Sequence, residues 1–311
     1  MAETSNGYKH LFICGLNRSG TTLLAREIAK LKDCTAFANT GVPMDEGQYL
    51  QDVYPARGIY GGVGRFGFAR AARLTEASPL LTPANISRLR QSWGQYWDCN
   101  KAIRIEKTPK NLLMTRFLQA AFENAYFVVI KRHPVPVSLA TQKWSRTSLP
   151  SLFEHWLRCH RIFDEDKKRL KHCYEFRYED YIGSPAKYIS EIAAFIGTDS
   201  TGFTANEAVG AYNNAYFTQW QEMLHRSCFY RRVAGAYEER FAAHGYWLSE
   251  PFCRTPLPTS SNGSVARPVG VPFSAGAEIR AFWWHKWTAL EPRARRYWTQ
   301  LRTTPVPRKS G

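Results

Sequence analysis

The sequence predicts an α/β fold of three layers, with a central parallel sheet covered by helices on both faces. Two observations favour this fold. Between residue 10 and about residue 200, short apolar runs alternate with segments of helical periodicity, which is typical of parallel strands joined by crossover helices. In addition, residues 126–130 are wholly apolar, as expected of a strand that is buried on both faces.

The expected elements follow in order along the chain. The first apolar run leads through a Gly-containing loop into a helix that carries Leu24, Ile28 and Leu31 on one face. Further helices are expected at residues 111–122 and around residues 186–196. The predicted strands are residues 11–14, 102–105, 126–130 and 174–178. Ligands bind beyond the carboxyl ends of the strands in open parallel sheets, so the four segments that follow these strands should meet in one crevice.

Outside the predicted sheet, the composition changes along the chain. Residues 41–100 contain several glycines and little periodicity, which predicts a loop-rich insertion. Residues 251–275 carry five prolines together with Ser and Gly, as linkers do. We therefore expect a main domain at residues 1–250, a linker at 251–275 and a basic, Trp-rich extension at 276–311. The extension is suited to docking on the main domain or to peripheral contact with an anionic membrane surface.

The charge balance predicts an anionic partner. The chain of 311 residues has 42 Lys and Arg against 26 Asp and Glu, a formal net charge of +16. No nucleic-acid reader motif accompanies this charge, so we expect no nucleic-acid partner. With 44% hydrophobic residues, the chain has enough apolar material for a large core, which excludes a disordered protein.

Other features predict a cytoplasmic protein. No window approaches the roughly 18 apolar residues that a membrane-spanning helix needs, and the first residues lack the apolar region of a signal peptide. The seven cysteines show no CxxC spacing, so neither a disulfide framework nor a zinc site is expected. The acidic run at residues 164–166 lies among basic residues and is interpreted as a solvated helix face, so no metal site is expected.

The loop after the first predicted strand has the character of an anion-binding site. Backbone N–H groups of such a loop and the positive end of the next helix attract an anion, and hydroxyl groups add further donors. Thr21 stands where nucleoside-triphosphate P-loops have their lysine, which disfavours a kinase or ATPase. The loop therefore suits an anionic group shorter than a triphosphate. The residues that would bind this group are Asn17, Arg18, Ser19, Gly20, Thr21 and Thr22.

The third predicted strand is followed by a second candidate anion-binding residue, Arg132. A guanidinium that leaves a buried strand presents a bidentate fork suited to a phosphate. Ser138 and Thr141 follow in the next predicted helix and could each bond the same phosphate.

Together these segments resemble the sulfotransferases that use 3′-phosphoadenosine-5′-phosphosulfate (PAPS). The loop at residues 15–22 is similar to their 5′-phosphosulfate loop, and residues 126–138 resemble their strand and helix for the 3′-phosphate. Residues 176–180 are similar to a third segment, whose tyrosine, here Tyr178, lies by the adenine. The resemblance covers roughly residues 10–248 and is closer to the tyrosylprotein and bacterial branches than to the cytosolic phenol branch. It implies a P-loop-like fold, PAPS as co-substrate and no metal requirement.

The chain departs from the family pattern in two places. The serine for the 3′-phosphate usually lies eight residues after the arginine, and Ala140 occupies that position here, so Ser138 and Thr141 both remain candidates. The family also carries a basic, Gly-containing segment near its C-terminus. Residues 231–235 match this segment only in part.

Sulfuryl transfer also needs a cation at the leaving group and a base for the acceptor proton. Lys107, at the end of the second predicted strand, is the expected cation. No histidine follows Lys107, so the base should be a carboxylate. Glu46, placed where the tyrosylprotein branch carries its glutamate, is the first candidate, Asp45 the second and Glu106 the third.

The predicted function is sulfuryl transfer to a hydroxyl or an amine of a carbohydrate, a glycolipid or a small metabolite. A small-molecule or glycan acceptor is favoured over a protein tyrosine because the sequence shows no secretory address. The alternatives are a P-loop kinase acting on a nucleotide or small molecule, and a non-enzymatic binder of polyanions or nucleic acid.

Overall fold

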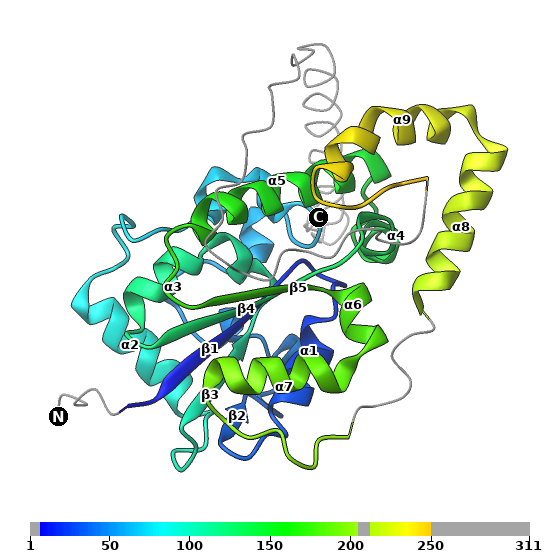
Figure 1. Ribbon diagram of the computed structural model, residues 1–311. Helices are drawn as coiled ribbons and strands as arrows, with labels where there is room; N and C mark the ends of the chain where they lie inside the picture. The colour runs from blue at the N-terminus through cyan, green and yellow to red at the C-terminus, as the bar shows by residue number, and fades with distance from the viewer. Residues whose placement is uncertain (1–6, 205–211, 250–311) are drawn as a thin grey trace, which may run out of the picture. The chain divides into compact units, whose positions relative to one another are not determined.

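The computed structural model describes residues 7–204 and 212–249. These residues form a five-stranded, wholly parallel sheet in the order β2-β3-β1-β4-β5, with helices on both faces (Figure 1). The predicted α/β fold with a central parallel sheet is therefore confirmed. The predicted linker and extension at residues 251–311 lie outside the described residues.

The strands match the predicted apolar runs closely, with one addition. The short strand β2 has no counterpart in the prediction, because three residues are too few for a periodic pattern. The strands are β1 (Lys9–Cys14), β2 (Cys34–Ala36), β3 (Ile103–Lys107), β4 (Ala125–Lys131) and β5 (Cys173–Arg177).

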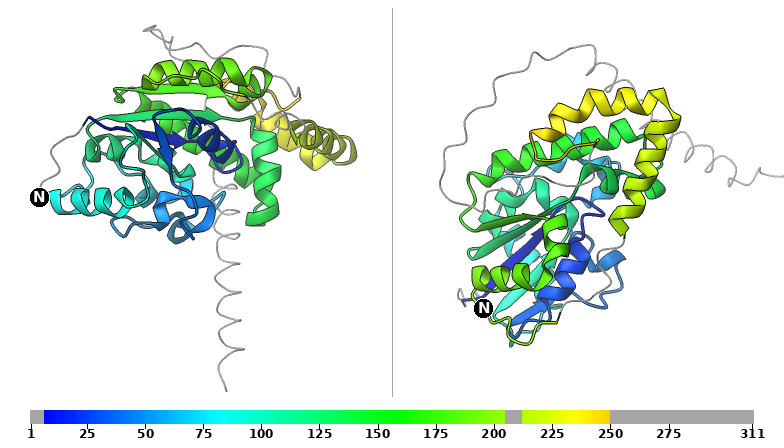
Figure 2. Two further views of the ribbon diagram at one scale, coloured as in Figure 1. Left: turned by 90° about the horizontal axis from the view of Figure 1, so that it is seen from below. Right: turned by 45° about the vertical axis from the view of Figure 1, so that its right-hand side comes forward.

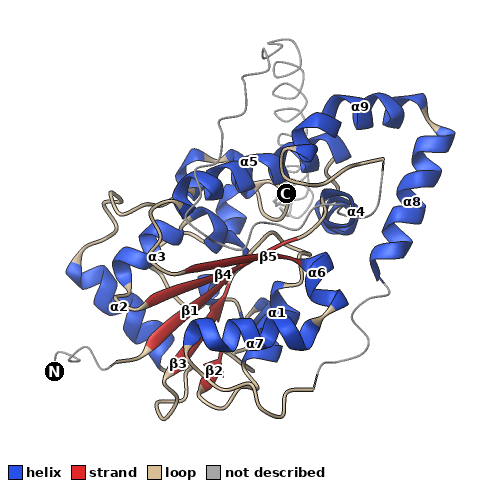
Figure 3. Cartoon of the chain, viewed as in Figure 1, coloured by secondary structure: helices blue, strands red, loops and turns tan. Residues whose placement is uncertain are grey.

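Nine α-helices are described, together with several 3-10 turns (Figure 3). The helix expected at residues 111–122 is divided into a 3-10 turn, Pro109–Leu113, and the helix α3. The α-helices are α1 (Thr21–Ile28), α2 (Pro83–Gly94), α3 (Thr115–Ala121), α4 (Pro134–Ser145), α5 (Leu149–Lys167), α6 (Tyr178–Gly183), α7 (Pro185–Ile196), α8 (Tyr212–Arg226) and α9 (Cys228–Ala242).

The core lies in two layers because side chains alternate across the sheet. In β1, Leu11 and Ile13 pack with α1 and α7, whereas Phe12 and Cys14 pack with α2, α3 and α5 on the other face. All four side chains are fully buried. Figure 2 shows these layers edge-on and the pair α8 and α9 beside α4 and α5. Within the described residues, no helix has the length and apolar character needed to cross a membrane.

The segment between β2 and α2 is held to the rest of the domain by long-range hydrogen bonds. It forms five 3-10 turns instead of regular strands or helices. The indole of Trp93 donates to the carbonyl of Gly47 at 2.9 Å, and Nζ of Lys110 donates to the carbonyl of Pro55 at 2.9 Å. Nε of Arg65 donates to the hydroxyl of Thr147 at 3.0 Å. This segment carries Glu46, so its anchoring fixes one wall of the candidate site.

Candidate active site

The loop between β1 and α1 ends in a glycine whose backbone and surroundings disfavour any other residue. Gly20 has a φ of 95°, and a Cβ there would lie 2.8 Å from Cδ2 of Tyr178. The close approach places the Tyr178 ring directly against the loop. α1 begins at Thr21, so the N–H groups of its first turn have no acceptor within the helix and remain available to an anion.

The polar side chains of this loop are arranged for a ligand. Ser19 is fully buried, and neither its hydroxyl nor the side-chain oxygen of Asn17 has a hydrogen-bond partner among the described residues. Thr21 is also buried, Thr22 is half-buried and Arg18 is exposed. Buried polar groups are normally paired, so the unpaired oxygens fit a loop that is completed by a polar ligand.

Arg132 lies directly beside this loop, as the sequence predicted. Nη1 of Arg132 donates to the carbonyl of Arg18 at 2.6 Å, and the guanidinium stacks on Tyr178 at 4.3 Å from the ring centroid. Burial lowers the pKa of Arg132, while the neighbouring Tyr178 and Glu179 raise it. The end of β4, the loop after β1 and the start of α6 therefore meet at one edge of the sheet.

Ser138 and Thr141 lie one helical turn apart on α4, and both are buried. The Ser138 hydroxyl has no partner within the described part of the chain. Both residues line a small pocket, whose walls are Leu16, Asn17, Gly64, Val137, Ser138, Thr141, Leu152 and His155. The pocket adjoins the loop but does not include Arg132, so the structure does not decide between the two hydroxyls.

The predicted catalytic residues Lys107 and Glu46 face each other. The parallel register pairs Lys107 with Ile13, two residues before the loop. Nζ of Lys107 lies 3.5 Å from Oε1 of Glu46 and donates to the carbonyl of Met44 at 3.0 Å. Burial lowers the pKa of Lys107, and the nearby Glu46 and Glu106 raise it.

Arg57 is a partner of Glu46 that the sequence analysis missed. Its Nη1 donates to Oε2 of Glu46, and the side chain of Gln48 donates to the same oxygen. Glu46 is only 2% exposed, so two cations and an amide surround a buried carboxylate. The Glu46 carboxylate is therefore held by ion pairs with Lys107 and Arg57 and by a hydrogen bond from Gln48.

The two alternative bases have other partners. Asp45 is half-buried and accepts two hydrogen bonds from Thr40, at 2.9 Å and 2.7 Å. Glu106 is fully buried and accepts hydrogen bonds from Gly47, Thr108 and Asn111, and burial raises its pKa to about 6. The bond from the backbone of Gly47 ties Glu106 to the segment that carries Glu46. These contacts favour Glu46 as the residue that faces the Lys107 ammonium.

Asn213 is a second residue that the sequence analysis missed. It lies in the first turn of α8, and its side chain bonds the guanidinium of Arg132. By contrast, the basic segment at residues 231–235 lies within α9, where Arg231 donates to the carbonyls of Leu224 and His225. No short-range pattern marks Asn213, because its partner lies 81 positions earlier in the chain.

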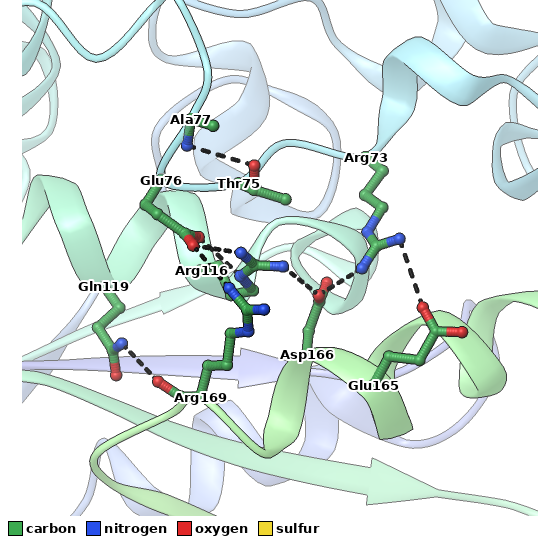
Figure 4. Close-up of polar contacts among 9 residues, drawn as sticks. All are labelled: Arg73, Thr75, Glu76, Ala77, Arg116, Gln119, Glu165, Asp166 and Arg169. Atoms are coloured by element: carbon green, nitrogen blue, oxygen red, sulfur yellow. Dashed lines mark hydrogen bonds and ion pairs between the residues drawn. The ribbon is translucent and has the colours of Figure 1, made fainter.

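The acidic run at residues 164–166 is not a uniformly solvated helix face (Figure 4). Asp166 is fully buried and accepts hydrogen bonds from Arg73 at 2.6 Å and Arg116 at 3.2 Å. Arg116 also pairs with Glu76. The run therefore anchors the segment before α2 to α3 and α5.

A model of the sulfotransferase family matches residues 10–202, more than half of the chain. A search of curated proteins finds no match.

Solved structures give weaker likenesses. A sulfotransferase domain of the Synechococcus PCC 7002 olefin synthase is 17% identical, with a TM-score of 0.43, and the match covers 70% of this chain and 84% of that domain. A sulfotransferase from Mycobacterium tuberculosis H37Rv is 15% identical, with a TM-score of 0.45, and the match covers 76% of this chain and 77% of that one. Identities and TM-scores this low do not by themselves assign a chain to a family. The family model decides the assignment, and with it the resemblance and the enzyme class predicted from the sequence are confirmed: the chain belongs to the sulfotransferase family.

Proposed function

We propose that this sulfotransferase takes the sulfuryl group from PAPS and transfers it to a hydroxyl or an amine of a carbohydrate, a glycolipid or a small metabolite. The observation that carries the donor assignment is the meeting of Arg132, Tyr178 and the loop at residues 15–20 at one edge of the sheet. The unpaired buried oxygens of Ser19 and Asn17 fit a polar ligand in this loop.

Each part of the donor has a proposed set of partners. The loop N–H groups and the residues Asn17, Arg18, Ser19, Gly20, Thr21 and Thr22 would hold the 5′-phosphosulfate. Arg132, with Ser138 or Thr141, would hold the 3′-phosphate, and the Tyr178 ring would contact the adenine. PAPS supplies an activated sulfuryl group, so the protein needs to orient the reactants and to neutralise charge.

Two residues would carry the chemistry. The Lys107 ammonium would stabilise negative charge on the oxygen that leaves with the donor phosphate. The Glu46 carboxylate would take the proton from the acceptor hydroxyl or amine as that group attacks. The 3.5 Å separation of Lys107 and Glu46 supports this pair, because both groups must be close to the transferring group.

Calorimetry with 3′-phosphoadenosine-5′-phosphate (PAP) and adenosine-5′-phosphate tests the donor assignment. PAP should bind much more tightly, and without Mg²⁺. A charge-assisted hydrogen bond contributes about 1.5 to 3 kcal/mol, so Arg132→Ala should weaken PAP binding by roughly 10- to 150-fold. Arg161→Ala, a change at an exposed arginine of α5, is the matched control and should leave PAP binding unchanged. Equal affinity of the wild type for the two nucleotides would refute the assignment.

A further inference from the structure

The side chain of Asn213 joins three segments that are far apart in the sequence. It is buried, and its Oδ1 accepts hydrogen bonds from Nε of Arg132 at 3.0 Å and from Nη2 of the same residue. Its Nδ2 donates to Oε1 of Glu179 at 3.4 Å. The same Glu179 oxygen accepts the backbone N–H of His133 at 3.0 Å. Asn213 therefore links α8 to the end of β4 and to α6.

These contacts use only part of the hydrogen-bonding capacity of Arg132. A guanidinium has five N–H groups. Two of them bond Asn213, and one bonds the carbonyl of Arg18. One N–H group remains on each terminal nitrogen, so both can donate to the oxygens of a phosphate.

Asn213 holds the guanidinium without neutralising it. Its amide oxygen is an uncharged acceptor, whereas a carboxylate in the same place would form an ion pair with Arg132. Arg132 thus keeps its positive charge for an incoming anion. An aspartate of almost the same size would compete with that anion for the guanidinium.

We propose that Asn213 is a positioning residue that fixes the selectivity of the donor site for the 3′-phosphate. It orients Arg132 so that the two remaining N–H groups face that phosphate, and it leaves the charge of Arg132 available. This inference rests on the proposed role of Arg132 in donor binding. It adds α8, which lies outside the segments that resemble the family's donor motifs, to the determinants of donor recognition.

The test compares PAP with adenosine-5′-phosphate, which lacks the 3′-phosphate, by calorimetry. Asn213→Asp should weaken PAP binding by about 10- to 100-fold, and Asn213→Ala by about 3- to 10-fold. Binding of adenosine-5′-phosphate should change by no more than about threefold in either variant. Asn214→Asp introduces the same charge at the exposed neighbouring position and is the matched control, with PAP affinity within about threefold of the wild type.

The outcomes separate this inference from the proposal on which it rests. A wild type that prefers PAP, with Asn213→Asp equally selective, would overturn the inference alone. An equal loss of affinity for both nucleotides would also overturn it, because Asn213 would then act only on the fold. If the wild type binds both nucleotides equally, the donor assignment fails and the inference fails with it. Should the Asp variant not fold, the Ala variant decides by the same criterion.

Discussion

Replacing Glu46 by Gln should lower both the free energy of unfolding and the turnover, because the carboxylate is buried between two cations. The carboxylate is the counter-charge for Arg57 and Lys107, which are only 8% and 5% exposed. Removing one partner of a buried ion pair costs about 3 to 5 kcal/mol. Loss of a general base should in addition slow turnover by at least about a hundredfold, with little change in PAP affinity.

Arg57 provides the variants that separate the two effects. Arg57→Met removes one cation and leaves the Glu46 carboxylate beside Lys107. If slow turnover in Glu46→Gln came only from a loosened segment, Arg57→Met should be as slow. The double variant Glu46→Gln/Arg57→Met should recover part of the lost stability, because it no longer buries an unpaired guanidinium, but should recover none of the turnover.

The measurements are denaturant unfolding for stability and transfer of labelled sulfate from PAPS for turnover. The acceptor for this assay is found by screening labelled PAPS against pools of metabolites and glycans. Turnover of Glu46→Gln within about threefold of the wild type, together with its loss in Asp45→Asn or Glu106→Gln, would refute the assignment of the base to Glu46.

Three further predictions follow from single contacts. Gly20→Ala should weaken PAP binding at least about tenfold in calorimetry. The added Cβ would meet the Tyr178 ring, and the φ of 95° costs an L-residue about 1 to 2 kcal/mol. Unchanged PAP affinity would contradict this account of the loop. The folded protein holds the Glu106 proton more tightly than the unfolded chain does, since burial raises the pKa of Glu106 from 4.5 to about 6. The stability of the wild type relative to Glu106→Gln should therefore fall by about 2 kcal/mol in total as the pH rises from about 3.5 to about 7, with most of the fall between the two pKa values. A flat difference in unfolding titrations would contradict this prediction. Asp166→Asn should lower the free energy of unfolding by about 2 kcal/mol, because it removes a charge paired with Arg73 and Arg116. PAP affinity should stay unchanged. A loss of PAP affinity would show that the contacts of Asp166 with Arg73 and Arg116 affect the donor site.

The parts of the fold that follow local rules were predictable from the sequence. Four of the five strands coincide with apolar runs, since a parallel sheet buries its strands on both faces. The positions of Lys107 and Arg132 at the ends of β3 and β4 follow from the same rule. A parallel sheet brings the ends of neighbouring strands to one edge, so the meeting of Arg132 with the loop was also predictable.

The contacts that complete the site were not predictable, because they depend on tertiary packing. Arg57 reaches Glu46 only through the fold of an irregular segment, and Asn213 reaches Arg132 from 81 positions away. The misinterpretation of Asp166 has the same cause. Its neighbours in sequence indicate a solvated face, whereas its partners Arg73 and Arg116 come from other elements.

The anchored segment between β2 and α2 has a consequence for how an acceptor is selected. It is tied down at residues 47, 55 and 65, by hydrogen bonds with Trp93, Lys110 and Thr147. The conformational entropy of this segment is therefore lost when the chain folds and not when a substrate arrives. On the proposed role of Glu46, an acceptor would meet a preorganised wall whose shape is already set. New acceptor preferences would then arise more readily through exchange of exposed side chains of this segment, such as Met44 and Ile59, than through changes in its backbone.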